Sequence, residues 1–262
     1  MNSCKRFGVL LVAVVLGAGT AACTASQTPT AGPPSPVVHP TVAAECPDVS
    51  TGGQQAWFSD VKGVNIGAVM LGTGSVGVVL AHQADEDSCE WLPYGKELAA
   101  AGYKVLAFDF AGSGVSGDLG TDARDANVVA AAGYLLGHGA TSIVLLGASM
   151  GGNASLVAAT KIIPQVAGVI SMSAPASYQG LNALSAVANL KAPVLYIAGK
   201  DDGTFPDDAT AMYNATPINS KKLLIVDSFN HGVALLVPQD PQSRKVRTAI
   251  TDFLHRYAPA NS

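Results

Sequence analysis

The chain has 262 residues, of which 48% are hydrophobic and 13% are charged, so it is long and apolar enough to bury one sizeable core. It carries 15 basic and 19 acidic residues, which gives a formal net charge of −4, and no basic patch stands out. This balance argues against a nucleic-acid-binding protein.

The first 22 residues have the pattern of a signal peptide. A short positive region at Lys5 and Arg6 precedes an apolar stretch, and small residues follow just before Cys23. Small residues ending in a cysteine resemble the lipobox of bacterial lipoproteins, in which that cysteine is lipid-modified after cleavage. Lipidation of Cys23 is therefore expected, with ordinary secretion after cleavage near Ala22 as the alternative.

Residues 23–45 are rich in Thr, Ser, Pro and Ala and predict an extended tether without a core of its own. Such a tether would hold a folded domain, predicted over residues 46–262, away from a membrane surface. We expect an exported protein held by its lipid on the extracytoplasmic face of the cell membrane, or else a secreted one.

The cysteines agree with export. Cys4 leaves with the signal peptide and Cys23 would carry lipid, which leaves Cys46 and Cys89 in the folded domain. An even pair in an oxidising compartment predicts a disulfide. The alternative is two unrelated buried thiols.

Strand-like and helix-like segments alternate after Cys46. Strands are predicted at 55–59, 64–71, 76–81, 104–109, 143–146, 167–172, 193–198 and 222–226, the first two as a hairpin edge. Helices are predicted at 92–101, 123–136, 153–160, around 207–213, and in a closing segment with Asp240 as N-cap and Pro241 at its first position. This order predicts an α/β domain, a mostly parallel sheet with helices on both faces.

Two stretches, 72–77 and 112–117, match the G-x-G-x-x-G pattern of dinucleotide-binding loops. A strand follows the first stretch where a helix is needed. The second stretch lacks an acidic residue at the end of the next strand. Both are interpreted as turns, and no cofactor is expected.

Residues 147–151 read Gly-Ala-Ser-Met-Gly between an apolar strand and a helix. This is the G-x-S-x-G pattern of a nucleophile elbow, in which the serine occupies a strained turn that leaves no room for side chains at the flanking positions. Ser149 is the candidate nucleophile. The alternative interpretation is a glycine-rich strand end.

A serine hydroxyl needs a base to take its proton, and that base needs an orienting acid. Asp202 and His231 each follow a predicted strand. They are therefore expected beyond the carboxyl ends of the strands, at the same end of the sheet as Ser149. Asp201 is the second choice for the acid. The alternative is that these groups are solvated loop residues.

From Gly63 to Tyr257 the domain resembles the α/β-hydrolase superfamily, on the elbow, His231-Gly232 and the stretches 78–83, 102–114 and 199–206. The resemblance implies that Asp202 is the acid and that Asp109 belongs to a structural turn. It also implies an oxyanion hole made of the N–H groups of Met150 and Gln83, where members usually have His-Gly in place of His82-Gln83. His82 is expected to order its loop.

These features predict an α/β-hydrolase fold with a short or absent lid and a serine hydrolase that cleaves carboxylic esters. The substrate would be a small-molecule or lipid ester, and no metal is expected. The segment 173–192 has room for one short helix and few large apolar side chains, which favours short acyl chains. The alternatives are a non-catalytic lipoprotein that binds a partner on this scaffold, and a lipid or sugar acyltransferase.

Overall fold

The computed structural model describes residues 40–46, 52–118, 120 and 124–260. The predicted signal peptide, Cys23 and most of the predicted tether lie outside the described residues, as does the predicted start of a helix at 121–123. Within the described ranges, no helix combines the length and the apolar character that crossing a bilayer requires.

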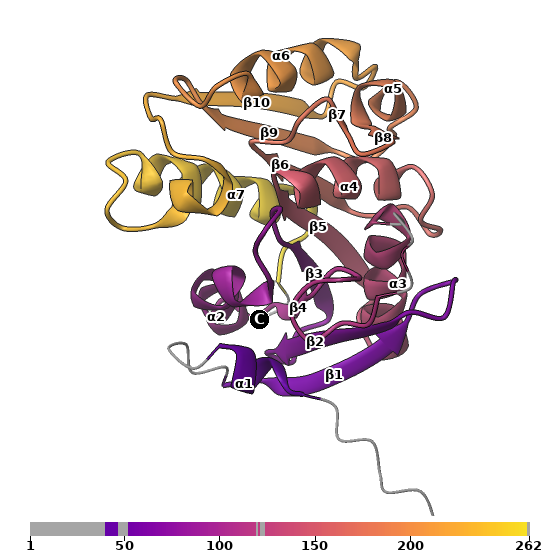
Figure 1. Cartoon of the computed structure of the whole chain (residues 1–262). Helices are drawn as coiled ribbons and strands as arrows, with labels where there is room; N and C mark the ends of the chain where they lie inside the picture. Colours follow the sequence, from indigo (N-terminus) through magenta and orange to yellow (C-terminus); the bar gives the residue numbers. More distant parts are fainter. Residues whose placement is uncertain (1–39, 47–51, 119, 121–123, 261–262) are drawn as a thin grey trace, which may run out of the picture. The chain divides into compact units, whose positions relative to one another are not determined.

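Eight strands form the main sheet, in the order β1-β2-β4-β3-β5-β6-β9-β10 (Figure 1). Strands β1 and β2 form an antiparallel hairpin at one edge, β2 also pairs antiparallel with β4, and the remaining pairs are parallel. The bounds are β1 Gln54–Ser59, β2 Asn65–Leu71, β3 Val76–Ala81, β4 Lys104–Phe108, β5 Ser142–Ala148, β6 Gly168–Met172, β9 Val194–Gly199 and β10 Lys221–Val226.

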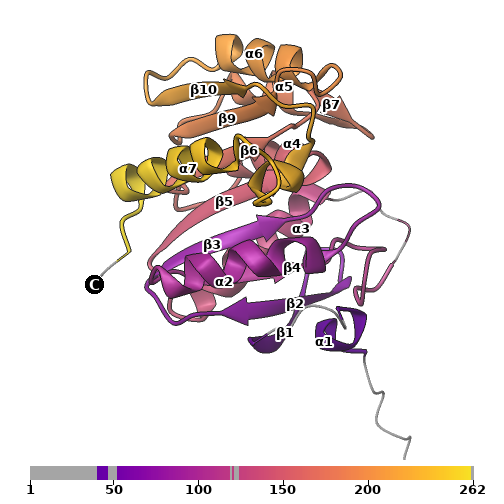
Figure 2. The same ribbon diagram turned by 90° about the vertical axis from the view of Figure 1, so that its left-hand side faces the viewer.

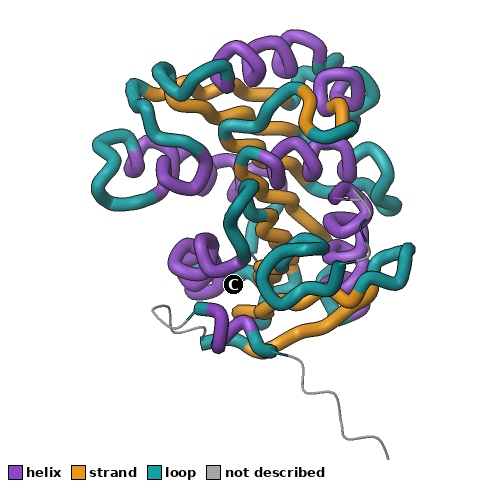
Figure 3. Tube along the Cα trace, viewed as in Figure 1, coloured by secondary structure: helices purple, strands orange, loops and turns teal. Residues whose placement is uncertain are grey.

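Helices cover both faces of this sheet, so the predicted fold class is confirmed (Figures 2 and 3). Alternate residues of a strand point to opposite faces, and in β3 Val79 joins one core while Val78 joins the other. The first core includes α3 (Arg124–Gly137), α4 (Met150–Ala159), α5 (Ala183–Val187) and α6 (Phe205–Ala215); the second includes α2 (Leu92–Ala100) and α7 (Ser243–Tyr257).

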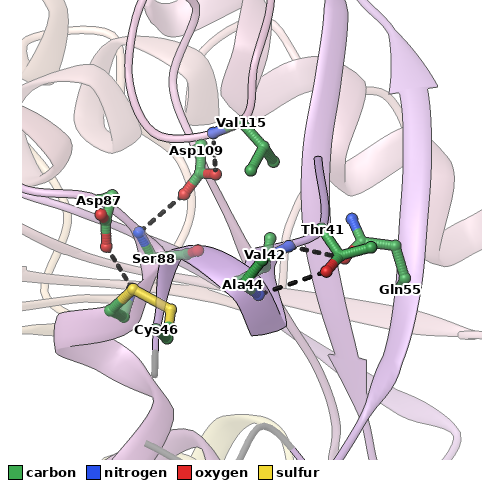
Figure 4. Close-up of a disulfide and its surroundings, with 10 residues drawn as sticks. Thr41, Val42, Ala44, Cys46, Gln55, Asp87, Ser88, Asp109 and Val115 are labelled. Carbon is green, nitrogen blue, oxygen red and sulfur yellow. Dashed lines mark hydrogen bonds between the residues drawn. A yellow bond between two sulfur atoms is a disulfide. The ribbon is translucent and has the colours of Figure 1, made fainter. Parts of the chain in front are cut away.

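The end of the predicted tether is folded. Residues Val42–Glu45 form α1, and Val42 is fully buried in the second core. The Thr41 hydroxyl accepts the Ala44 N–H, and the Val42 N–H donates to the Gln55 side chain on β1 (Figure 4). The last residues of the predicted tether therefore pack on the domain, because the buried Val42 side chain and the Val42–Gln55 hydrogen bond hold this turn against it, and the Thr41 hydroxyl caps the turn.

Cys46 and Cys89 form a disulfide with their Cα atoms 5.5 Å apart (Figure 4). Cys89 belongs to the short 3-10 helix η1 (Ser88–Trp91), and its N–H donates to the Asp87 carboxylate. The bond fastens the end of α1 to the segment that follows β3.

The closing helix starts later than predicted. Its first residue is Ser243, and Gln242 occupies the N-cap position without a side-chain hydrogen bond. The Asp240 carboxylate instead accepts hydrogen bonds from the Ser228 hydroxyl, the Asn230 amide and the Gln242 N–H. Asp240 therefore braces the loop after β10, and Pro241 precedes the helix.

The segment 173–192 contains one short helix, α5, as predicted. It also contains a two-residue hairpin, β7 (Ser177–Tyr178) with β8 (Leu181–Asn182), which was not predicted because strands of two residues carry no periodic signal.

Candidate active site

Ser149 occupies a strained turn between β5 and α4. Its backbone has φ +50° and ψ −119°, a conformation that side-chain-bearing residues rarely adopt. A Cβ on Gly147 would lie 2.3 Å from the Gly151 carbonyl oxygen, and a Cβ on Gly151 would lie 2.2 Å from the Ala81 carbonyl oxygen. Both glycines are therefore required by backbone packing.

Asp202 and His231 are hydrogen-bonded to each other. Asp202 follows β9 and is buried, and both of its carboxylate oxygens lie 3.0 Å from His231 Nδ1. The Phe205 ring packs against the imidazole with 4.3 Å between the ring centroids. Because Nδ1 faces a carboxylate, it carries the proton, and Nε2 is the nitrogen that can accept one. The second choice, Asp201, is exposed, and within the described residues His231 Nδ1 is hydrogen-bonded to Asp202 instead.

The loop that carries His231 packs against the elbow. We call residues 227–233 the histidine loop. The Gly232 N–H donates to the Ser173 hydroxyl at 3.0 Å, and a Cβ on Gly232 would lie 3.2 Å from the Ala148 Cβ. The backbone of Gly232, next to His231, therefore lies close to Ala148, the residue before Ser149. Among the described residues, the Ser149 hydroxyl has no hydrogen-bond partner, and neither does His231 Nε2.

The expected oxyanion donors differ in their availability. The Met150 N–H, at the start of α4, has no hydrogen-bond partner among the described residues. The Gln83 N–H donates to Glu90 Oε1 at 2.9 Å, so it is already used. The next amide, that of Ala84, has no partner within the described part of the chain, and Ala84 and Met150 line the same cavity of about 610 Å³.

Comparisons with known proteins concern the fold and the central part of the chain. Residues 75–186, less than half of the chain, match a family model described as serine aminopeptidase, S33. No curated protein matches the chain. An esterase of Pyrococcus furiosus superimposes with a TM-score of 0.69 at 18% identity, over 80% of this chain and 95% of the esterase.

Two further solved structures are similar to this chain at comparable TM-scores and identities. An esterase from Rhodococcus sp. gives a TM-score of 0.63 at 18% identity, over 76% of this chain and 99% of the esterase. A monoacylglycerol lipase of Paleococcus ferrophilus gives 0.63 at 18% identity, over 74% and 99% of the two chains. The chain has the α/β-hydrolase fold. The family model supports placement in the same superfamily.

Two polar residues of this α/β-hydrolase fold serve the loops around the site. His82 is buried; its Nε2 accepts the Phe110 N–H at 3.0 Å, so its Nδ1 carries the proton and donates to the Gln83 carbonyl at 2.7 Å. Burial lowers the pKa of His82, which keeps the ring neutral. The Asp109 carboxylate accepts the Ser88 and Val115 N–H groups (Figure 4).

Glu90 is the functional neighbour that the sequence did not reveal. Burial raises the pKa of this carboxyl to about 8, against the effect of the Gln83 N–H, and the nearby Glu86 and Asp87 carboxylates add to the rise. A glutamate in a short 3-10 helix carries no motif, so only the structure could place it behind the loop after β3.

The cavity beside Met150 is lined mainly by polar groups. Arg124 lies on its wall, where Nε is 2.9 Å from the Met150 sulfur and the guanidinium carbon is 5.7 Å from the Tyr178 ring centroid. The remaining lining includes the acidic residues Asp85, Glu86 and Asp87. Arg124 was not singled out in the sequence because it sits at an ordinary helix start.

One group of potential metal ligands was found among the described residues. Cys46, Asp87 and Cys89 have ligand atoms within 4.8 Å of one another. Both sulfur atoms belong to the disulfide, and a metal needs thiolates, so this group does not form a metal site while the disulfide is intact.

Proposed function

We propose that the protein is a serine hydrolase that cleaves carboxylic esters. The proposal rests on one observation. Asp202 and His231 are hydrogen-bonded to each other beyond the carboxyl ends of their strands, and the same end of the sheet carries Ser149 on a strained turn flanked by glycines. Similarity of fold to esterases and a lipase supports hydrolase chemistry of this kind, although many reactions use this scaffold.

In the proposed mechanism the Ser149 hydroxyl attacks the ester carbonyl carbon. His231 Nε2 takes the hydroxyl proton and then gives it to the departing alcohol, which leaves an acyl group on Ser149. Water attacks this acyl group and its proton passes to the same nitrogen, which gives it to the departing Ser149 oxygen as the acid is released. Asp202 holds the imidazole tautomer and stabilises the imidazolium that forms twice in the cycle.

We assign the oxyanion donors to the N–H groups of Met150 and Ala84. Both amides are free of other partners among the described residues and belong to residues that line one cavity, whereas the Gln83 amide is bonded to Glu90. Helix α4 begins at Met150, so its positive end adds to the stabilisation of a developing negative charge.

The test is active-site labelling with a fluorophosphonate probe. We expect the wild-type protein to be labelled and Ser149→Ala to lose both labelling and hydrolysis of p-nitrophenyl butyrate, with its melting temperature preserved. Loss of a triad nucleophile removes several orders of magnitude in rate, so retention of more than about a tenth of the activity would exclude Ser149 as the nucleophile.

A second candidate is hydrolysis of amides at a free amino terminus, because the matching family model is described as serine aminopeptidase. Aminoacyl p-nitroanilides compared with p-nitrophenyl esters by kcat/KM would rank the two reactions. Both use the same nucleophile, so the ranking leaves the triad assignment unchanged.

We further propose that Cys23 carries lipid and anchors the domain on the extracytoplasmic face of the membrane. The support is the sequence pattern before Cys23 and the Thr- and Pro-rich stretch that follows it. The mature protein should partition into detergent, and Cys23→Ala should release or mislocalise it. A mature protein whose mass includes no lipid would contradict the anchor.

A further inference from the structure

Gln83 is bonded to its surroundings in three directions. Its N–H donates to Glu90 Oε1 at 2.9 Å, and its carbonyl accepts from His82 Nδ1 at 2.7 Å. Its side-chain Oε1 accepts the Val233 N–H at 3.4 Å. Hydrogen bonds to His82 and Glu90 therefore fix the backbone of Gln83 within the loop after β3, and its side chain contacts the histidine loop.

This contact spans strands that are not neighbours. In the sheet order β3-β5-β6-β9-β10, three strands separate β3 from β10, so backbone pairing cannot hold their loops together. Ser173, which follows β6, makes a second hydrogen bond to the histidine loop, because its buried hydroxyl accepts the Gly232 N–H. Two successive amides of the histidine loop are thus bound by side chains from other strand ends.

The Gln83 side chain lies directly against the Gly232 backbone. It has φ +52°, and a Cβ at this position would lie 2.1 Å from Gln83 Oε1. The family resemblance places glycine where Gln83 stands, and a glycine has no side chain to make this contact. The bridge therefore depends on the glutamine that this chain has in that place.

We propose that Gln83 is a positioning residue that holds the histidine loop in a fixed position relative to the Ala84 amide. It thereby fixes His231 relative to the oxyanion hole. This inference rests on the proposed function, because it assigns Ala84 and His231 their roles in ester hydrolysis. At 3.4 Å the hydrogen bond is long, so its contribution is mainly geometric.

The test compares two side chains of similar length at position 83. Gln83→Met removes the acceptor oxygen, Gln83→Glu keeps an oxygen at the same place, and Gln239→Met is the matched control at an exposed residue after η2 (Gly232–Leu236). Each protein is assayed with p-nitrophenyl butyrate on the plateau of its own pH profile, and its melting temperature is recorded.

Displacement of a catalytic group by a fraction of an ångström to one ångström lowers rates by about ten- to a hundredfold, so kcat of Gln83→Met should fall about tenfold. Its KM should stay within about twofold, since ground-state binding is not altered. Gln83→Glu should retain most of the wild-type kcat, and Gln239→Met all of it. A fall of less than about threefold in Gln83→Met, or an equal fall in Gln83→Glu, would overturn the proposal.

Two further measurements keep the outcome unambiguous. If Gln83→Met does not fold, Gln83→Gly replaces it under the same criterion, because glycine is the residue usual at this position. Fluorophosphonate labelling of the wild type separates the two ideas. If the wild type is not labelled, the proposed function fails; if it is labelled and Gln83→Met reacts equally fast, only the positioning role fails.

Discussion

At the scale of single residues, the Glu90 carboxyl is in an unusual environment. It accepts the Gln83 N–H behind the loop after β3, and burial disfavours its ionised form.

Glu90 makes stability depend on pH. Its folded-state pKa is raised from 4.5 to about 8, so the folded protein holds a proton that the unfolded chain releases between those values. The stability that this proton provides is complete below pH 4.5 and is lost as the pH rises through about 8. Glu90→Gln keeps the acceptor for the Gln83 N–H but does not titrate.

We therefore expect the wild-type free energy of unfolding, relative to that of Glu90→Gln, to fall by about 1.4 kcal/mol per pH unit inside this window. Denaturant titrations at several pH values would measure it, with Glu45→Gln, an exposed residue of α1, as the control. Parallel pH curves for wild type and Glu90→Gln would contradict a raised pKa.

The candidate site could be predicted from the sequence only where its residues belong to a motif. Ser149 lies in a pentapeptide, and Asp202 and His231 follow predicted strands, so all three could be named in advance. Glu90 and Ala84 belong to no sequence pattern. Their roles depend on the hydrogen bond between Glu90 and the Gln83 amide, which leaves the Ala84 amide as the one without a partner in this loop, within the described residues.

At the scale of elements, the strands and long helices were predictable because their apolar periodicity extends over several residues. Prediction was weaker where side-chain contacts decide a boundary. Asp240 looked like an N-cap, but Ser228 and Asn230 use its carboxylate, and α7 starts at Ser243. In α1, the buried Val42 side chain packs the end of the predicted tether into the second core.

The elbow should not tolerate a methyl group at Gly151. An alanine Cβ there would lie 2.2 Å from the carbonyl oxygen of Ala81 on β3, a central strand that cannot move aside. Gly151→Ala should lower the melting temperature and slow fluorophosphonate labelling by at least about tenfold. The matched control is Gly133→Ala in α3, where nothing lies within 4 Å of the added Cβ.

Gly133→Ala should be neutral or stabilising, because alanine is favoured over glycine in a helix interior by about 0.5–1 kcal/mol. Normal labelling and melting of Gly151→Ala would show that the elbow backbone can shift.

The disulfide should raise the stability of the folded domain. It closes a loop with a sequence separation of 43, for which chain entropy corresponds to about 4 kcal/mol. Reduction, or replacement of Cys46 and Cys89 by serine, should lower the melting temperature. The double variant should not respond to reductant; two freely alkylated cysteines in the native protein would contradict the bridge.

At the scale of the whole molecule, the fold was predictable, but the shape of the cavity was not. The segment 173–192 contributes Ala183 and Val187 to the core beneath it, and it forms no large lid. The cavity beside Met150 is lined mainly by polar groups, among them Arg124 and the four acidic residues Asp85, Glu86, Asp87 and Asp118. These features favour small substrates.

Short acyl esters should be turned over faster than long ones. A long acyl chain gains about 0.8 kcal/mol for each CH₂ group it buries, and this requires an apolar wall. We expect the highest kcat/KM for p-nitrophenyl esters of about two to six carbons, measured below micelle-forming concentrations. An optimum at about twelve carbons or more would favour a lipase or a lipid acyltransferase.

The covalent link between α1 and η1 also determines how the domain bears mechanical load. A pulling force applied to the chain before residue 40 is transmitted from Cys46 through the disulfide to Cys89 in η1. It therefore acts on η1 before it acts on β1. Strand β1 lies at the edge of the sheet, where pulling would otherwise peel it away from β2. With the proposed lipid anchor, a pulling force would therefore load the disulfide before the hydrogen bonds between β1 and β2.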